Sequence, residues 1–369
     1  MFPYTRYVMI SILAIFLAFS LAVSAQVAVH PAVIATDLKH PWSIDWLNAE
    51  TALVTERDGR LIAIHLPTGA KTEILGVPPV VASGQGGLFD VRVRRDQDIL
   101  WVYLSLAGAH PDGGTGTELW RAQLRGQRLE QPERLFRMNK GGSSGRHFGG
   151  RIVLDQDHVY LTIGDRGEQD RSQDLSDHAG SIIRLHLDGR IPDDNPFRTQ
   201  LDTLPEIYSY GHRNPQGAAL HPETGALWTH EHGPQGGDEI NRIVAGRNYG
   251  WPIITYGRNY GLGTPIGEGT EKDGMEQPQL YWDPSIAPSG MTFYQGTAIP
   301  EWQGSWFVGA LKAQMLVQLN QGDGLMRQVA RLFRGELGRI RDVREGPDGA
   351  LYLLTDAGRG QLIRLDRAN

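Results

Sequence analysis

Hydrophobic and polar positions alternate along this chain in short segments, and the pattern recurs six times. Each repeat holds three apolar segments that are separated by Gly, Asp, Asn and Pro. An alternation with a period of two is typical of half-buried β-strands, and the turn formers mark where each strand ends. The middle segments of the six repeats are Ala52–Thr55, Trp101–Ser105, Val159–Thr162, Ala226–Thr229, Trp306–Gly309 and Leu351–Thr355.

The other two apolar segments of each repeat flank the middle one. The preceding segments are Ser43–Leu47, Gly87–Val93, Gly150–Leu154, Gly217–Leu220, Gly290–Tyr294 and Ile340–Val343. The following segments are Leu61–Leu66, Leu119–Leu124, Ile182–Leu187, Glu239–Val244, Met315–Leu319 and Leu362–Leu365. Sheets that repeat at this spacing predict an all-β fold, a six-bladed β-propeller of four-stranded antiparallel blades. A two-sheet β-sandwich is the alternative.

The first 25 residues do not follow this pattern. Arg6 is their one charge, an apolar run begins at Val8, and the small residues Val23-Ser24-Ala25 fit a cleavage site. Residues 1–25 are therefore predicted to be a cleaved signal peptide, and residues 26–369 a single propeller domain in the periplasm or outside the cell. The alternative is an uncleaved anchor, because the apolar run is about long enough to span a bilayer.

Composition narrows the chemistry. The chain has 36 Lys and Arg against 42 Asp and Glu, a formal net charge of −6, so no basic field attracts nucleic acid. It contains no cysteine, which excludes disulfides, thiolate nucleophiles and cysteine-based zinc sites. At 40% hydrophobic and 21% charged residues, it has the composition of an ordinary globular protein.

The loops that lead into the first strand of each repeat are polar and rich in glycine. In a propeller these first strands line the central channel, so the loops before them open at one channel mouth. They are predicted to gather six side chains around one cavity: Gln85, His147, Arg213, Asn214, Arg339 and Arg341. Loops between second and third strands open on the same face, which adds the loop after Thr229 and also Lys312.

Four cations in one cavity of an acidic protein indicate a ligand with several negative charges. Guanidinium groups suit carboxylates and stack on flat rings. His147 is the natural general base there, because imidazole is neutral near pH 7 and accepts a proton. A histidine in a loop is more often a structural hydrogen bonder, which is how we interpret His212.

The loop from Glu231 to Glu239 offers oxygen ligands instead of cations. Besides these two carboxylates it contains Asp238 and the backbone carbonyls of Gly233 and Pro234, a set that suits calcium. Zinc is a competing interpretation, because residues 230 and 232 are both histidines. No third zinc ligand is evident in the sequence.

The motifs, taken in order, resemble the soluble PQQ-dependent sugar dehydrogenases, a glucose/sorbosone dehydrogenase-like family, and within it the aldose sugar dehydrogenase branch. PQQ is pyrroloquinoline quinone, a planar cofactor with three carboxylates. The similarity runs from Pro41-Trp42 to Arg364. Its motifs are GQGG, RHFGGR, IGDRG, GHRNPQG, EHGPQGGDE, NYGWP, YWDPSIAPSG, GRIRDV and GPDGALYLLTD.

The resemblance implies a six-bladed propeller and a role for each matching residue. His147 would be the base that takes the C1 hydroxyl proton of an aldose, with Arg213 beside it. Trp282 would lie near the substrate. The implied PQQ contacts are Gln85, Arg213, Asn214, Tyr260, Lys312, Ala313, Arg339 and Arg341. The implied calcium ligands are carbonyls of Gly233 and Pro234 at the cofactor, and Glu239 with the Tyr249 carbonyl at a structural site.

One position departs from the glucose-specific branch of that family. An acidic residue precedes the base there, whereas Arg146 precedes it here, so glucose does not follow as the physiological sugar. Electrons would pass to a quinone, dye or cytochrome-type acceptor, and the absence of long insertions favours a monomer. Two other functions stay open: a calcium-dependent lactonase-type propeller, and a non-catalytic propeller that binds extracellular partners.

Overall fold

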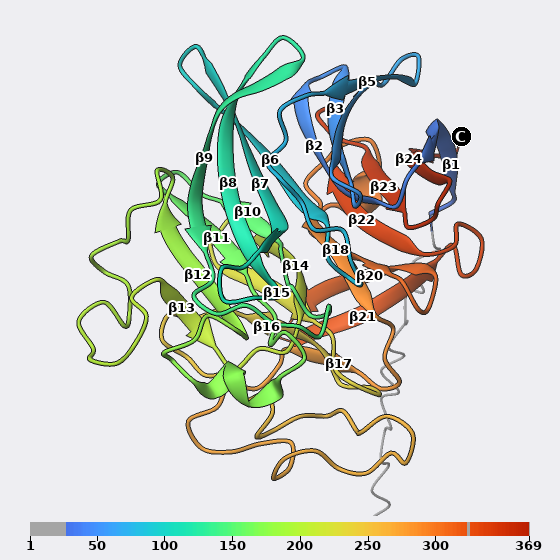
Figure 1. The fold of residues 1–369 in the computed structure, drawn as a ribbon. Helices are drawn as coiled ribbons and strands as arrows, with labels where there is room; N and C mark the ends of the chain where they lie inside the picture. The colour runs from blue at the N-terminus through green and yellow to red at the C-terminus, as the bar shows by residue number, and fades with distance from the viewer. Residues whose placement is uncertain (1–26, 323–324, 369) are drawn as a thin grey trace, which may run out of the picture.

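The strands of this protein assemble into six four-stranded antiparallel sheets (Figure 1). This computed structural model describes residues 27–322 and 325–368, and the predicted six-bladed propeller is confirmed over them. The predicted signal peptide lies outside the described residues. Within the described ranges, no helix is long and apolar enough to cross a membrane.

The first three blades follow one another along the chain, each from its inner to its outer strand. Blade 1 consists of β2 (Pro41–Asn48), β3 (Thr51–Glu56), β4 (Arg60–His65) and β5 (Ala70–Ile74). Blade 2 consists of β6 (Leu88–Asp96), β7 (Ile99–Ala109), β8 (Thr115–Arg125) and β9 (Arg128–Arg137). Blade 3 consists of β10 (Ile152–Leu154), β11 (His158–Thr162), β12 (Ser181–His186) and β13 (Ile207–Tyr210).

Blades 4 and 5 repeat this order, and blade 6 takes its fourth strand from the other end of the chain. Blade 4 consists of β14 (Pro215–Leu220), β15 (Leu227–Glu231), β16 (Asp238–Arg242) and β17 (Leu280–Trp282). Blade 5 consists of β18 (Pro288–Phe293), β19 (Trp306–Ala310), β20 (Met315–Gly322) and β21 (Leu325–Leu332). Blade 6 consists of β22 (Ile340–Glu345), β23 (Leu351–Thr355), β24 (Gly360–Arg367) and β1 (Val29–Leu38). Short 3₁₀ helices cover Gln169–Gln173 (η1) and Pro300–Trp302 (η2).

Blade 6 closes the ring. Its outer strand β1 pairs antiparallel with β24, with Val29 opposite Arg367 and Val33 opposite Ile363. The sequence pattern did not predict β1, because its alternation is irregular and the register shifts after Val33. The two ends of the described chain are thus held together by one sheet.

Each pair of neighbouring blades buries its own hydrophobic cluster. Leu53 of blade 1 and Leu104 of blade 2 share one cluster, and Trp228 of blade 4 and Trp306 of blade 5 share another. Six such clusters account for the six interfaces. Large apolar side chains contribute most of this burial free energy, so the periodic segments found in the sequence are the ones that join the blades.

Six charged side chains from the inner strands form a balanced ion network at the axis, here called the axial hub. The hub consists of Asp45, Asp90, Arg92, Arg151, Asp342 and Arg344. Arg151 Nη1 lies 3.3 Å from Asp90 Oδ1 and 3.1 Å from Asp342 Oδ1. Arg344 contacts the same two carboxylates at 3.5 and 3.4 Å. Three carboxylates and three guanidinium groups therefore cancel in the centre of the propeller.

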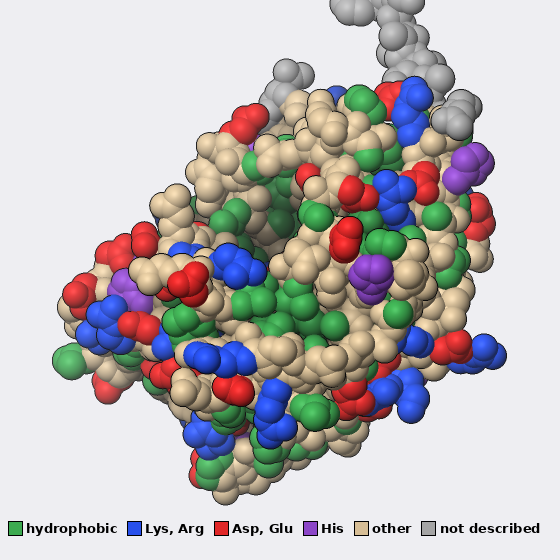
Figure 2. Space-filling model, turned by 90° about the horizontal axis from the view of Figure 1, so that it is seen from above, with side chains coloured by type: hydrophobic (Ala, Val, Ile, Leu, Met, Phe, Trp, Pro, Cys, Tyr) green, Lys and Arg blue, Asp and Glu red, His purple; other side chains and the backbone are tan. Residues whose placement is uncertain are grey.

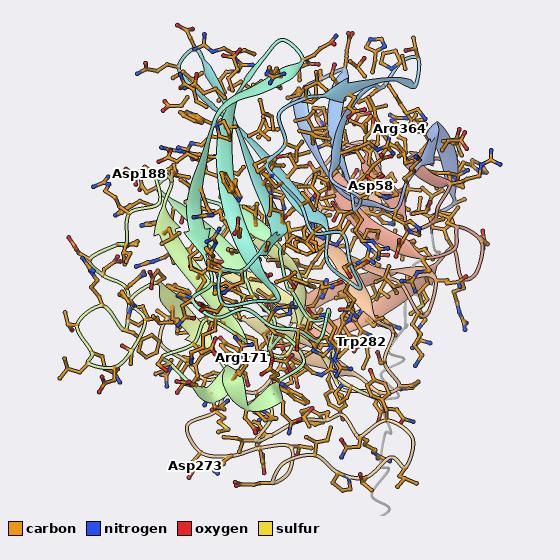
Figure 3. The ribbon with its side chains drawn as sticks, viewed as in Figure 1. Asp58, Arg171, Asp188, Asp273, Trp282 and Arg364 are labelled. Atoms are coloured by element: carbon orange, nitrogen blue, oxygen red, sulfur yellow. The ribbon has the colours of Figure 1, made fainter. Side chains whose placement is uncertain are left out.

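A long loop, residues 243–279, joins β16 to β17 and forms the lower edge of the view in Figure 1. Asp273 in Figure 3 marks this loop. It folds back so that Gln235 N donates to the Arg258 carbonyl at 3.1 Å, which ties it to the loop between β15 and β16. On the face shown in Figure 2, acidic and basic side chains are interspersed, so no field of one sign stands out there.

Candidate active site at the channel mouth

The loops between blades surround a channel cavity of about 270 Å³. Five of its lining residues come from loops that lead into first strands, as the repeat predicted. These are Gln85, Asn214, Ala287, Arg339 and Arg341. The other lining residues are Trp42, Arg57, Gln216, His232, Leu311 and Asp356. The ring of loops is therefore one site, to which every blade but blade 3 contributes lining residues. The loop before blade 3 is linked to the site by the hydrogen bond from His147 N to Gln85 Oε1.

Cations outnumber carboxylates in this cavity. Asp356 Oδ2 accepts from Arg339 Nη2 at 3.0 Å and Arg341 Nη2 at 2.8 Å, while its Oδ1 lies 3.0 Å from His40 Nδ1. Burial alone would raise the pKa of Asp356, but the charge of Arg341 and these hydrogen bonds outweigh it and hold the pKa well below its ordinary value. One ionised carboxylate thus serves two guanidinium groups, and a third, Arg57, lines the same space.

His147 sits at the edge of this site in a fixed orientation. Its backbone N–H donates to Gln85 Oε1 at 2.9 Å, and its φ of +52° lies in the left-handed region. The glycine at 164 is required by close approach, because a Cβ there would lie 2.3 Å from the His147 carbonyl oxygen. Strained backbone of this kind gathers at functional sites, where surrounding contacts hold it.

Asp165 determines which nitrogen of His147 can act. Its Oδ1 lies 2.6 Å from His147 Nδ1, and its Oδ2 accepts from Trp251 Nε1 at 2.8 Å. A carboxylate at Nδ1 keeps the proton there and leaves Nε2 as the acceptor. Burial lowers the pKa of His147 below its ordinary value, and the hydrogen bond from Asp165 opposes this. The ring is therefore neutral at physiological pH and is able to take up a proton.

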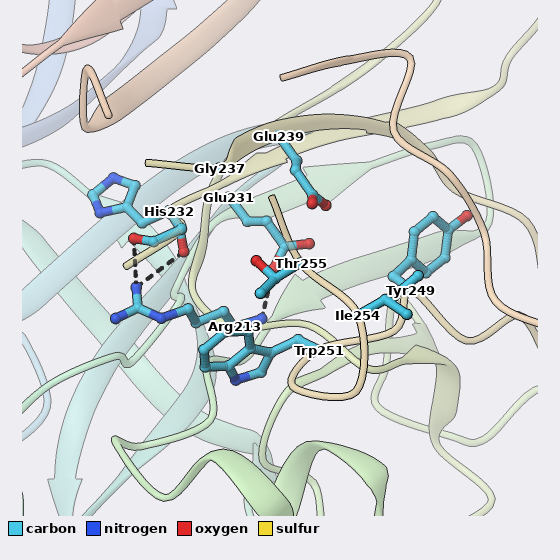
Figure 4. Close-up of a pocket in the computed structure, with 10 residues that line it drawn as sticks. Arg213, Glu231, His232, Gly237, Glu239, Tyr249, Trp251, Ile254 and Thr255 are labelled. Carbon is cyan, nitrogen blue, oxygen red and sulfur yellow. Dashed lines mark hydrogen bonds between the residues drawn. The ribbon is translucent and has the colours of Figure 1, made fainter. Parts of the chain in front are cut away.

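Arg213 lines a second, smaller pocket (Figure 4), and His232 lines both this pocket and the channel cavity. Its Nη1 donates to the carbonyl oxygens of His232 at 3.0 Å and Gly233 at 2.9 Å. Its guanidinium lies 5.2 Å above the Trp251 ring, and its Nε has no hydrogen-bond partner among the described atoms. Arg213 thus holds a buried charge with donor capacity left for a ligand.

The small pocket, of about 10 Å³, lies between two buried carboxylates, Glu231 and Glu239, and Tyr249 also lines it. Asn241 Nδ2 contacts both, at 3.2 Å from Glu231 Oε1 and 3.3 Å from Glu239 Oε2. Burial, and then the negative charge of Glu231, raise the pKa of Glu239 to about 8. A space of this size holds one small ion or water rather than an organic ligand.

The histidines near this pocket have structural surroundings. His212 is fully buried between Glu231 Oε1 at 2.9 Å and Ser209 Oγ at 2.9 Å, and it stacks on Tyr249. Its contacts are those of a residue that braces the loop. Burial lowers the pKa of His232 to about 3, and His230 is completely buried. In the described part of the chain no three His, Asp or Glu side chains group as metal ligands, so the zinc interpretation gains no third ligand.

Besides Arg213, four predicted contact residues do not line the channel cavity. Lys312 is exposed in the turn between β19 and β20, and Ala313 packs against the core of blades 4 and 5. Tyr260 is 69% exposed on the long loop. Trp282 is buried in the same core, where its Nε1 donates to Gln328 Oε1 at 3.0 Å (Figure 3). Because its indole ring is buried in this core and its Nε1 is already hydrogen-bonded, Trp282 is not assigned as a substrate contact.

Several residues of the site were missed from the sequence, although a signal for them existed. Arg57, Asp165 and Asp356 all lie just beyond a second strand, on the face where such loops open. The sequence prediction used loops between second and third strands at two places only, after Thr229 and at Lys312. Gln216 is different, because it lies inside β14 and binds Arg341 Nη1 through its Oε1 at 3.1 Å.

Comparison with known proteins decides the family. The glucose/sorbosone dehydrogenase family matches residues 38–364. The chain belongs to this family. The predicted membership, and with it the classification as a dehydrogenase, is confirmed.

Individual relatives agree over almost the whole chain. Aldose sugar dehydrogenase YliI of Escherichia coli is 39% identical, over 94% of this chain and 95% of that protein. The crystal structure of the E. coli soluble aldose sugar dehydrogenase in its apo-form matches with a TM-score of 0.89, covering 92% of this chain and all of that one. The PQQ-bound aldose sugar dehydrogenase of Streptomyces coelicolor matches at 28% identity with a TM-score of 0.75, covering 92% and 98%.

Proposed function

We propose that this protein oxidises aldose sugars at C1 to lactones, with PQQ as the electron-accepting cofactor, calcium as its metal and His147 as the general base. The observation that carries the proposal is the His147–Asp165 pair beside a cavity with excess cations. Relatives named aldose sugar dehydrogenase, one of them in a PQQ-bound form, support the same reaction class.

The channel cavity fits PQQ by charge and by shape. Arg57, Arg339 and Arg341 face a space with one carboxylate of the protein, so the carboxylates of a polyanionic ligand would offset the positive charge that Asp356 leaves. Trp42 offers a flat apolar wall to a planar ring, and it is held 4.3 Å from the Arg151 guanidinium. Gln85 and Asn214 add polar contacts, and Asn214 Oδ1 is itself fixed by Gly149 N–H at 3.1 Å.

Calcium fits two places by the chemistry of the donors. The Gly233 and Pro234 carbonyls would hold the ion that polarises the cofactor. A side chain at Gly233 would collide with Gly236 O at 2.1 Å. Glu239 and the Tyr249 carbonyl would hold a structural ion in the small pocket. A cation there would relieve the repulsion that raises the pKa of Glu239, and calcium prefers such hard oxygen ligands.

When bound, PQQ supplies the acceptor for the hydrogen and electron pair that leave C1. His147 Nε2 takes the hydroxyl proton from the same carbon, so the C1–O bond becomes a carbonyl and the cyclic aldose becomes a lactone. Asp165 stabilises the imidazolium that forms, and Trp251 holds Asp165 in place. Arg213, which lines the small pocket, would stabilise the developing alkoxide through its positive charge.

The other two functions receive less support. A lactonase site needs carboxylates and amides around a metal in the channel, whereas the one carboxylate among the described cavity residues, Asp356, is already engaged by Arg339, Arg341 and His40. A pure binding module would have no need for a buried histidine–carboxylate pair.

The test is reconstitution of the purified protein with PQQ and Ca²⁺, followed by dye reduction with several aldoses. We expect PQQ-dependent turnover, and a His147→Ala variant that keeps PQQ binding but loses turnover by a factor of at least about 100. His65→Ala, at an exposed histidine of β4, is the matched control and should turn over normally. Absence of both PQQ binding and aldose oxidation would refute the proposal.

We further propose that the protein is exported to the periplasm as a monomer after cleavage behind Ala25. N-terminal sequencing of the periplasmic protein should begin at Gln26, and light scattering should give the mass of one chain. A membrane-bound fraction that retains Met1 would instead show an uncleaved anchor.

A further inference from the structure

A second cavity, of about 290 Å³, opens beside the channel cavity between blades 6 and 1. We call it the vestibule. Its lining residues are Lys39, His40, Arg57, Asp58, Ala82 and Gly358. Arg57 lines both cavities and is the wall between them. Whatever occupies the vestibule is therefore separated from the channel cavity by one side chain.

The vestibule has an excess of positive charge. Within the described ranges, neither Lys39 nor Arg57 has a carboxylate oxygen within 4.0 Å of a side-chain nitrogen. Asp58 is the one carboxylate in the lining, and it contacts Arg60 at 3.3 Å. Cations left without a partner beside a cavity favour an anionic ligand.

Its walls are held rigidly, as expected of a binding site rather than a frayed loop. His40 has a φ of +46°, its N–H donates to Ala357 O at 2.9 Å, and its carbonyl accepts from Arg57 N at 3.2 Å. Arg57 in turn packs so closely on Gly87 that a Cβ there would lie 2.4 Å from its Cγ. A strained residue fixed by hydrogen bonds on both sides is a reason to look for a function.

The vestibule is connected to the active site on both sides. His40 Nδ1 bonds to Asp356, the carboxylate that holds Arg339 and Arg341. Ala82 of the vestibule lies three residues before Gln85 in the same loop, and Gln85 Oε1 accepts a hydrogen bond from His147 N. A molecule in the vestibule would thus lie beside the channel ligand and within reach of the substrate.

We propose that the vestibule is an anion-binding subsite, in which Lys39 and Arg57 hold a carboxylate, phosphate or phenolate group of a small organic molecule that takes part in the reaction. This rests on the proposed function. Two molecules have this chemistry: an anionic electron acceptor, and an aldose that carries an acidic group. An electron acceptor would lie next to the cofactor in the channel cavity, because Arg57 lines both cavities. An acidic sugar would lie close to His147, because the loop of Ala82 also carries Gln85, which bonds to His147.

Lys39→Ala tests the proposal, because Lys39 is exposed and lines the vestibule but not the channel cavity. Lys71→Ala is the control, an exposed lysine of blade 1 that lines neither cavity. Binding of 2,6-dichlorophenolindophenol, an anionic dye, and of glucose 6-phosphate to the protein without PQQ is measured by calorimetry. We expect one of them to bind, and Lys39→Ala to weaken that binding about tenfold, the loss typical of one charged hydrogen bond.

Steady-state kinetics of the PQQ-loaded protein then separate the two sources. If the vestibule takes the acceptor, Lys39→Ala raises KM for the anionic dye and leaves KM unchanged for the cationic acceptor phenazine methosulfate. If it takes the sugar, KM rises for glucose 6-phosphate and not for glucose.

The subsite is refuted if neither anion binds the wild-type protein, or if Lys39→Ala binds both as the wild type does. PQQ-dependent turnover with such a result would leave the proposed function standing. Anion binding that depends on Lys39 in a protein without PQQ-dependent turnover would refute the function and keep the subsite.

Discussion

The axial hub and the channel mouth are both built from arginine and aspartate, yet they differ in how the charges are matched. The hub pairs three guanidinium groups directly with Asp90 and Asp342, and a third carboxylate, Asp45, lies near Arg92 and Arg344. At the mouth, one carboxylate, Asp356, serves Arg339 and Arg341, while Arg57 and Arg213 have no carboxylate in their side-chain contacts within the described ranges. A guanidinium group that is paired with a carboxylate of the protein does not need an anionic ligand. A guanidinium group without such a partner can bind one.

The same residue types thus do two jobs, and the sequence alone does not separate them. Trp42 lies at the border, because it stacks on Arg151 of the hub and lines the channel cavity. The comparison makes opposite predictions for arginine substitutions in the two places.

The largest effect is expected from Arg151→Met in the hub. This change leaves Asp90 and Asp342 buried with one cation fewer, and breaking a buried ion network in this way costs about 3–5 kcal/mol. Urea unfolding of the protein without PQQ should show the loss, and Arg95→Met, at an exposed arginine, should show almost none. A loss below about 1 kcal/mol would mean that the hub is not a structural network.

Arg341→Met at the mouth should give the reverse result. Burial already lowers the pKa of Arg341, and Asp356 keeps Arg339 and His40 as partners, so the free energy of unfolding without PQQ should fall less than it does in Arg151→Met. PQQ affinity should fall about 10- to 100-fold, because a charged hydrogen bond to the ligand is lost. Fluorescence titration with PQQ measures it; unchanged affinity would contradict the assignment of the mouth as the cofactor site.

Asp165→Asn sharpens the comparison within the active site. An amide cannot stabilise the imidazolium of His147 or fix its tautomer, so kcat should fall about 100-fold while PQQ affinity stays the same. In the wild type, kcat/KM should fall at low pH with an inflection below 6.5, because the pKa of His147 is lowered. In the variant this inflection should move further down, since the partner that opposes the lowering is gone. A wild-type inflection above 6.5 would argue against His147 as the base.

The last prediction concerns the small pocket. Glu239 has a pKa raised from its ordinary 4.5 to about 8, so without calcium the folded protein binds more protons than the unfolded chain between these values. Stability should therefore be fully present below about pH 4.5 and fall as the pH rises towards 8. Added Ca²⁺ should flatten this trend and raise Tm by a few degrees at pH 8. In Glu239→Gln both the trend and the calcium effect should disappear.

The sequence predicted the fold well because the fold depends on local periodicity. Three strands of each blade show an alternation that tertiary contacts only reinforce, and most loops at the mouth follow from that repeat. The outer strands were not located, since strands such as β13 and β17 are short and bounded by long irregular loops.

Site chemistry was harder to predict, because it depends on which charges meet. The arginines of the hub lie in or next to first strands, and so do Arg339 and Arg341 of the mouth, so the sequence does not tell them apart. Only the contacts in the structure show that carboxylates neutralise the arginines of the hub. Trp282 matched a motif, but its packing against Gln328 depends on how β17 lies on blade 5, which a motif does not encode.

The pairing of β1 with β24 bears on how this protein matures. Blades 1 to 5 consist of neighbouring strands, and each can form as soon as its own segment is available. Blade 6 cannot, because its strand order needs residues from both ends of the chain. The ring therefore stays open until the final strand has been made, and its closure joins the strands that are furthest apart in the sequence. Until then β1 has no partner strand, and its unpaired edge is a template for pairing with other chains.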